Sequence, residues 1–151
     1  MRCHPSYLAK SKGRCLRFLA NVDPIDIARA TENLNPEETL ILVNSKTFTT
    51  AETILNAKSC KEWLVKYYKS INVEDSELIF RSHICACSTN IEETTKFGIA
   101  KENVFGFWDF VGGRFSVWSA IGVLPLSVHF GYDIVQEFLN GGHNVDKTFA
   151  L

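Results

Sequence analysis

One run of the sequence, Thr39-Leu-Ile-Leu-Val-Asn44, most limits what this chain can fold into. Its residues favour β-structure and do not alternate between apolar and polar, a pattern typical of a strand that is covered on both faces. The Asn35-Pro36 pair ends a preceding helix, and residues 50 to about 69 carry apolar side chains at helical spacing. A buried strand between two helices predicts a parallel sheet that lies between layers of helices.

Strand and helix signals alternate along the rest of the chain. Strands are predicted at 15–21, 39–44, near 83–87 and at 104–108. Helices are predicted at 24–33 after the Asp23 cap, at 50–69, at 88–97 with Ser88 or Thr89 as cap, from about 116, and at 132–139. Ile25 and Ala28, with Ile27 as a further candidate, are expected to face inward, and Pro125 is expected to interrupt or end its helix. This order predicts a doubly wound α/β domain, with ligands beyond the carboxyl ends of the strands.

Composition excludes several classes of function. The 151 residues carry 16 basic and 17 acidic side chains, a net charge of −1, so no basic field holds a nucleic acid. No apolar run reaches the roughly 18 residues of a membrane span, and we expect a soluble, intracellular protein. The five cysteines are an odd number, which argues against a secreted disulfide framework. Cys85 and Cys87 lack a second pair at zinc-like spacing, so no metal site is predicted.

The loop Asn44-Ser-Lys-Thr-Phe-Thr-Thr50 joins the buried strand to the long helix. Its hydroxyls and free backbone amides converge at a helix N-terminus, which is the chemistry that a phosphate monoester needs. A Ser/Thr-rich turn of this kind is equally typical of a simple helix cap. Both interpretations remain open from chemistry alone, and the glycine spacing of a Walker loop is absent.

A second loop, Asp109-Phe-Val-Gly-Gly-Arg-Phe-Ser116, also lies where a strand gives way to a helix. The paired glycines allow a ligand to approach the backbone closely, and Arg114 could place a fixed cation against a developing oxyanion. The alternative is an ordinary Gly-Gly turn followed by a surface arginine.

These loops and the sequence between them resemble the glucose-6-phosphate isomerase family. The resemblance rests on Leu16-Arg-Phe-Leu-Ala-Asn-Val-Asp-Pro-Ile-Asp26, Ser45-Lys-Thr-Phe-Thr-Thr-Ala-Glu-Thr53, Ser88-Thr-Asn90, Lys96-Phe-Gly-Ile99 and Phe107-Trp-Asp-Phe-Val-Gly-Gly-Arg-Phe-Ser-Val-Trp-Ser-Ala-Ile-Gly122. It implies a sugar isomerase domain, flavodoxin-like and incomplete, over residues 15–151, after a basic segment at 1–14 that does not match.

The resemblance also implies a division of labour between the two loops. Ser45, Lys46, Thr47 and Thr50 would bind the sugar phosphate, and Arg114 beside Gly113 would stabilise the enediolate formed between glucose 6-phosphate and fructose 6-phosphate. It further implies a cytoplasmic enzyme of glycolysis and gluconeogenesis that needs no cofactor and is a homodimer at full length.

Several family features have no match in these residues. The glutamate base, the ring-opening histidine and the C-terminal lysine would lie beyond Leu151, so we expect the 151 residues alone to be inactive. No Gly-Gly-Ser loop is found upstream. His83, in an apolar run, is interpreted as a satisfied core or edge histidine and not as a catalyst, and Glu52 as a structural first-turn carboxylate. The alternatives are a non-catalytic sugar-phosphate-binding module or a truncated gene product.

Overall fold

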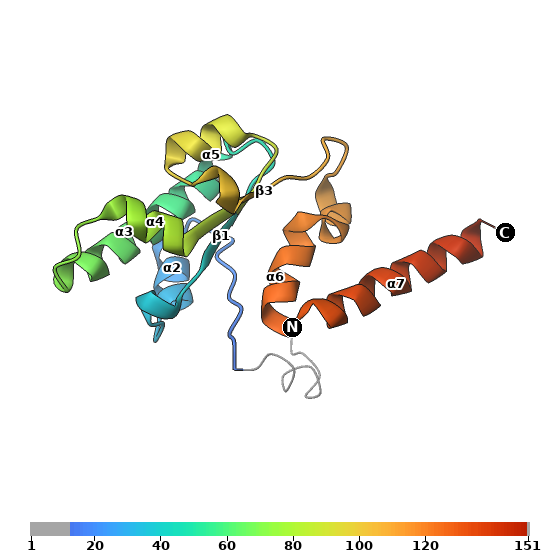
Figure 1. Cartoon of the computed structure of the whole chain (residues 1–151), viewed down its shortest axis with the longest axis horizontal. Helices are drawn as coiled ribbons and strands as arrows, with labels where there is room; N and C mark the ends of the chain where they lie inside the picture. The colour runs from blue at the N-terminus through green and yellow to red at the C-terminus, as the bar shows by residue number, and fades with distance from the viewer. Residues whose placement is uncertain (1–12, 151) are drawn as a thin grey trace. The chain divides into compact units, whose positions relative to one another are not determined.

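A computed structural model of the chain describes residues 13–150, which form two compact units (Figure 1). The first unit, residues 17–110, contains α2 (Pro24–Thr31), η2 (Pro36–Glu38), β1 (Ile41–Asn44), α3 (Ala51–Ser70), α4 (Ser76–His83), β2 (Ile84–Cys87), α5 (Ile91–Phe97), η3 (Lys101–Asn103) and β3 (Val104–Phe105). The second, residues 111–150 together with 13–16, contains η4 (Gly113–Trp118), α6 (Ala120–Phe130) and α7 (Tyr132–Phe149).

The first unit is built on a parallel sheet in the order β1-β2-β3. Ile41 pairs with Ile84 and Asn44 with Cys87, while β3 pairs only Val104 and Phe105 with the end of β2. The parallel α/β fold is therefore confirmed. The predicted strand at 104–108 is shorter, because the last backbone hydrogen bond to β3 runs from the Ser88 amide to the Phe105 carbonyl, and the next amide, of Thr89, donates to Lys46 instead. Since all three strands run the same way, the loops that follow them meet at one edge of the sheet.

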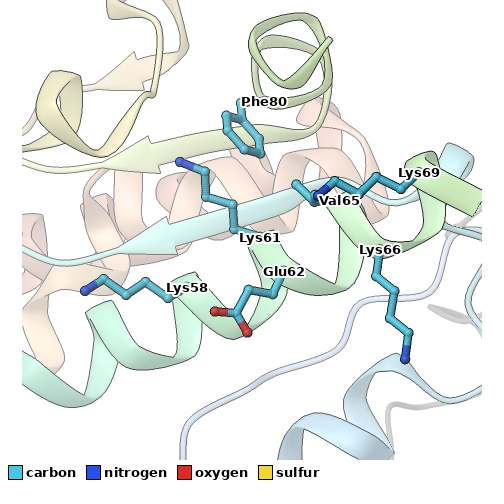
Figure 2. Close-up of a pocket in the computed structure, with 7 residues that line it drawn as sticks. All are labelled: Lys58, Lys61, Glu62, Val65, Lys66, Lys69 and Phe80. Atoms are coloured by element: carbon cyan, nitrogen blue, oxygen red, sulfur yellow. The ribbon is translucent and has the colours of Figure 1, made fainter. Parts of the chain in front are cut away.

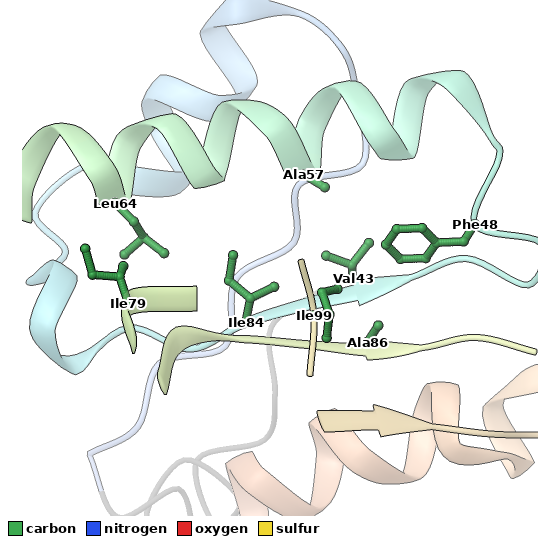
Figure 3. Close-up of a cluster of buried hydrophobic side chains, with 8 residues drawn as sticks. All are labelled: Val43, Phe48, Ala57, Leu64, Ile79, Ile84, Ala86 and Ile99. Carbon is green, nitrogen blue, oxygen red and sulfur yellow. The ribbon is translucent and has the colours of Figure 1, made fainter. Parts of the chain in front are cut away.

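Helix α3 covers one face of this sheet and supplies much of the core (Figure 3). Ala57 and Leu64 of α3 lie in one buried cluster with Val43 of β1 and Ile84 and Ala86 of β2. The alternate residues of β2, Cys85 and Cys87, point to the opposite face and are also buried. Burial on both faces explains why the sequence of β2 shows no polar alternation.

The strand predicted at 15–21 is wrong, because those residues form no regular structure. Phe18 is 74% exposed, so its side chain contributes little to the core. Arg17 instead donates from Nη1 to the carbonyls of Ala30 and Glu32, at 2.9 and 2.6 Å, at the C-terminal end of α2. These bonds satisfy free carbonyls of the helix end and hold the segment beside α2.

The helix predicted at 24–33 is confirmed as α2, with Asp23 accepting from the Ile25 amide at 2.8 Å. Its predicted inward face is wrong, since Ile25 and Ala28 are exposed and Ile27 is only half-buried. Helix α2 has only eight residues and packs along one side of α3, so it covers little surface. The apolar spacing alone therefore overestimated how many of its side chains are buried.

The second unit departs from expectation in its helices. Pro125 lies inside α6, which continues to Phe130, so the proline removes one helical hydrogen bond without ending the helix. Helix α7 runs to Phe149, ten residues beyond the predicted end at Leu139. The ring of Trp118 stacks on Phe138, 4.4 Å between centroids. Within residues 13–150, no helix has both the length and the apolar content needed to cross a membrane.

Candidate functional site

The three loops at the carboxyl edge of the sheet surround a hollow of about 390 Å³. It is lined by Thr47 from the loop after β1, by Thr89 and Asn90 from the loop after β2, and by residues 107–109 from the loop after β3. The carboxyl edge of a parallel sheet is where α/β proteins place their ligands. This hollow is therefore the candidate site of the first unit.

The loop after β1 holds Ser45, Lys46, Thr47 and Thr50, the four predicted phosphate-binding residues. Ser45 is buried, continues the strand pairing by donating its amide to the Cys87 carbonyl at 3.1 Å, and accepts from the Phe48 amide through Oγ at 3.1 Å. The Thr47 hydroxyl is exposed and lies 2.7 Å from that of Thr49. Ser45 thus braces the turn from inside, and Thr47 lies at its surface.

Thr50 occupies the N-cap position of α3, yet its side chain makes no capping hydrogen bond. The first-turn amides of an uncapped helix are free donors at the positive end of the helix dipole. A loop serving only as a helix cap would bond its hydroxyl to one of these amides. The exposed Thr50 hydroxyl and the free first turn are instead available to an anion.

Phe48 gives this loop an unusual backbone. Its φ is +56°, a left-handed value that non-glycine residues rarely adopt. The side chain is only 3% exposed and packs edge-on against the ring of Phe97, 5.6 Å between centroids. Burial of the ring therefore holds the backbone in this conformation. Left-handed residues are a common component of the backbone concavities that bind anions.

The side chain of Lys46 crosses to the loop after β3. Its Nζ donates to the carbonyl of Asp109 and lies 4.0 Å from the Asp109 carboxylate. Next to Asp109, the rings of Trp108 and Phe110 stack in parallel, 6.3 Å apart, and are 72% and 85% exposed. Lys46 thus links the loop after β1 to the two exposed aromatic rings, and its ammonium already contacts protein oxygens.

Gly113 and Arg114 belong to the second unit. They are the two residues predicted to stabilise the enediolate intermediate. Gly113 begins η4 with a φ of +55°, a conformation that glycine adopts without strain. Ser116 donates from Oγ to the Gly113 carbonyl at 2.7 Å and fixes this turn. The Arg114 side chain is exposed and binds no other group among the described residues.

Thr89 and Asn90 were not predicted as site residues, although they line the hollow and directly follow β2. The general rule that α/β proteins bind ligands at the carboxyl ends of their strands would have identified them. The sequence pattern at 88–93 instead predicted Ser88 or Thr89 as the cap of a short helix. This prediction is wrong in detail, because Asn90 caps α5 by accepting from the Glu93 amide at 3.1 Å.

A second hollow, of about 510 Å³, is lined by side chains of α3 between Lys58 and Lys69 and by Phe80 of α4 (Figure 2). Lys61 donates to the Phe97 carbonyl at 2.8 Å, and its Nζ lies 3.8 Å from the centre of the Phe80 ring. Burial lowers the pKa of Lys61. The side chains of Lys58 and Lys66 point away from this group in Figure 2, so the ammonium groups do not converge on one ligand.

The buried titratable groups of the first unit have structural roles. His83 is confirmed as a core histidine, with Nδ1 2.8 Å from the Thr39 carbonyl and Nε2 2.6 Å from the Tyr68 hydroxyl. Burial raises the pKa of Cys85 to about 11 and that of Cys87 to about 12. Thiols held protonated in this way are poor nucleophiles.

The comparisons with known proteins agree with this architecture. The family model described as phosphoglucose isomerase matches residues 5–151. The chain is 52% identical over 149 residues to glucose-6-phosphate isomerase, cytosolic A, of Oryza sativa subsp. japonica, and 49% identical over 149 residues to the cytosolic glucose-6-phosphate isomerase of Arabidopsis thaliana. Each match covers 99% of this chain and 25% of the relative, so the chain spans about a quarter of the length of these curated relatives.

Two solved structures superpose on most of this chain. A glucose-6-phosphate isomerase from Chlamydia trachomatis superposes with a TM-score of 0.66 at 28% identity, over 95% of this chain and 27% of that one. A hypothetical protein from Thermus thermophilus superposes with a TM-score of 0.64 at 27% identity, over 82% of this chain and 28% of that one.

Proposed function

The chain belongs to the phosphoglucose isomerase family, and we propose that it forms the phosphate-binding part of a site that interconverts glucose 6-phosphate and fructose 6-phosphate. The observation that carries this proposal is the uncapped N-terminus of α3 beside the exposed hydroxyls of Thr47 and Thr50. A phosphate monoester is a dianion that needs several converging donors, and this loop offers hydroxyls and first-turn amides together.

In this proposal Arg114 acts on the chemistry. Moving a proton between C1 and C2 of the sugar creates an enediolate with a negative charge that the ground-state sugar lacks. An arginine is always protonated, and its planar donors stabilise such an oxyanion. The flanking Gly113 lets the backbone approach the sugar. The reaction is redox-neutral, so the proposal includes no cofactor.

Assembly and location are also part of the proposal. The partial sugar isomerase domain would cover residues 15–151, and the complete protein would form a homodimer, as the resemblance implies. The curated relatives named above are cytosolic by name, and we place this protein in the same compartment.

A second candidate is a non-catalytic module that binds sugar phosphates. The observation that favours it is the acidic residue that lines the hollow. Among the residues described, Asp109 supplies the lining carboxylate, and its main chain and side chain both engage Lys46. The Asp109 side chain is 93% exposed, whereas a general base must be held within hydrogen-bond reach of the proton that it takes. The proposal therefore assigns the proton-transferring base to none of the described residues.

The proposal is tested by binding. The ¹⁵N-labelled 151-residue chain is titrated with inorganic phosphate and then with fructose 6-phosphate, and amide shifts are followed by NMR. We expect shifts concentrated at residues 46–53. Thr50→Val should weaken phosphate binding about 10- to 150-fold, because a hydrogen bond to a charged group contributes about 1.5–3 kcal/mol.

Thr95→Val is the matched control, since the Thr95 hydroxyl is exposed and bonds only the Ile91 carbonyl of its own helix. It should leave phosphate binding unchanged. Shifts that appear away from residues 46–53, or equal affinity in the Thr50→Val chain, contradict the proposed phosphate site. Catalysis itself is tested in a chimera in which this chain replaces the matching segment of the rice relative. A correctly folded chimera that binds fructose 6-phosphate without converting it favours the non-catalytic module.

A further inference from the structure

The segment that follows β2, Ser88-Thr89-Asn90, holds the backbone of the phosphate loop. We infer that these three are positioning residues that hold the Lys46 and Thr47 carbonyls away from the bound phosphate, so that the Thr47 amide faces it. This inference rests on the proposed function, because it describes how that phosphate site is built.

The carbonyl of Lys46 is the main point of attachment. It accepts from the Thr89 amide at 3.0 Å, from the Thr89 hydroxyl at 2.7 Å and from the Ser88 hydroxyl at 3.0 Å. A carbonyl oxygen has two lone pairs, so three donors saturate it. This oxygen is therefore fixed toward the loop after β2.

The next carbonyl along the loop is held in the same way. Asn90 donates from Nδ2 to the Thr47 carbonyl at 3.0 Å, while its Oδ1 accepts from the Glu93 amide at 3.1 Å. One side chain thus caps α5 and binds the phosphate loop. Because α5 is anchored by the same residue, the loop is attached to a helix and to the end of the central strand at once.

The consequence follows from peptide geometry. In a trans peptide the carbonyl and the following N–H point in opposite directions. Fixing the Lys46 carbonyl toward Thr89 directs the Thr47 amide to the other side of the loop. Fixing the Thr47 carbonyl toward Asn90 directs the Phe48 amide inward, where it donates to Ser45 Oγ at 3.1 Å.

The attachment also removes a repulsion. Two carbonyl dipoles left free in this loop could turn their negative ends toward a phosphate dianion. Here both carbonyls accept hydrogen bonds from residues that the fold holds in place, since Ser88 is 1% exposed and directly follows β2, and Asn90 caps α5. The loop therefore presents donors to an anion without having to reorganise on binding.

The test compares variants of the full 151-residue chain that differ in a single donor. Thr89→Val keeps the shape of the side chain and loses the hydroxyl, whereas Thr89→Ser keeps the hydroxyl. Asn90→Ser keeps an oxygen that can cap α5 but is too short to reach the Thr47 carbonyl. The readouts are the thermal midpoint, the NMR shift of the Thr47 amide and the dissociation constant for inorganic phosphate.

Thr89→Val and Asn90→Ser should each weaken phosphate binding about five- to tenfold, with a displaced Thr47 amide signal, and Thr89→Ser should bind as the unaltered chain does. A purely structural role would lower the thermal midpoint and leave phosphate affinity unchanged. Equal affinity in folded Thr89→Val or Asn90→Ser chains overturns this inference and leaves the proposed function standing. No phosphate binding by the unaltered chain overturns both. If Thr89→Val does not fold, Asn90→Ser decides between these outcomes.

Discussion

Phe48 offers a direct test of whether the loop after β1 is held in a strained conformation by its contact with the core. The perturbation is a pair of substitutions, Phe48→Ala and Phe48→Gly, which remove the same ring and differ only in a methyl group. Both lose a side chain that is 3% exposed and packs on Phe97. Each should therefore cost about 3–5 kcal/mol of unfolding free energy relative to the original chain.

The difference between the two variants isolates the backbone. Outside special conformations, glycine is less stable than alanine by about 0.5–1 kcal/mol, because it loses more freedom on folding. At a φ of +56° an L-residue pays about 1–2 kcal/mol that glycine does not pay. The second effect is the larger, so Phe48→Gly should equal Phe48→Ala in stability or exceed it by up to about 1.5 kcal/mol.

The assay is urea unfolding followed by far-ultraviolet circular dichroism, with the midpoint and slope fitted for each chain. Leu64 provides the matched control, because it is 0% exposed and lies in the interior of α3. There the order should reverse, with Leu64→Gly about 1 kcal/mol less stable than Leu64→Ala. If Phe48→Gly is also the less stable of its pair, the loop backbone is not strained and our reasoning about Phe48 is refuted.

Three further predictions concern the rest of the chain. In the rice chimera, Arg114→Ala should lower kcat by a factor of about 10²–10³ with little change in KM, and Arg114→Lys should restore only part of the lost kcat. A raised KM with unchanged kcat would place Arg114 at the phosphate instead. Burial raises the pKa values of Cys85 and Cys87 to about 11 and 12 from an ordinary 9.0, so the folded chain retains thiol protons that the unfolded chain loses. The urea midpoint should therefore fall as pH rises above about 9, and a Cys85→Ala/Cys87→Ala chain should show a weaker fall. A Cβ at Gly122 would clash with the carbonyl oxygen of Val117 in η4, so Gly122→Ala should destabilise α6 by about 1–3 kcal/mol in hydrogen exchange. Gly141→Ala, whose Cβ would meet no atom within 4 Å, should not.

The elements that sequence analysis predicted best are those with an unambiguous period. Residues 39–44 and 50–69 gave β1 and α3 to within two residues, because each run is long or uniformly apolar for its type. Helix α4 was not predicted. Its eight residues end at His83, immediately before β2, and their short apolar pattern merged with that of the strand.

The predicted strand at 15–21 failed for a different reason. Its composition suits a strand, but a strand exists only where a partner accepts its hydrogen bonds. Arg17 is bonded to the end of α2, so this segment follows a helix end and not the edge of β1. That choice depends on contacts between residues 13 or more positions apart, which local spacing does not contain.

The loop after β2 makes the same point at the candidate site. A hydroxyl residue followed three positions later by glutamate predicts a helix cap, and the pattern at 88–93 fits that description. In the structure Asn90 provides the cap, and the hydroxyls of Ser88 and Thr89 donate to the Lys46 carbonyl, 42 and 43 positions away in the chain. The sequence therefore indicates how many donors a loop holds, but the direction in which they donate is decided by the strand order that brings β1 and β2 together. Where two loops follow adjacent parallel strands, donors of one should be tested first against carbonyls of the other, because the sheet has already placed them within reach.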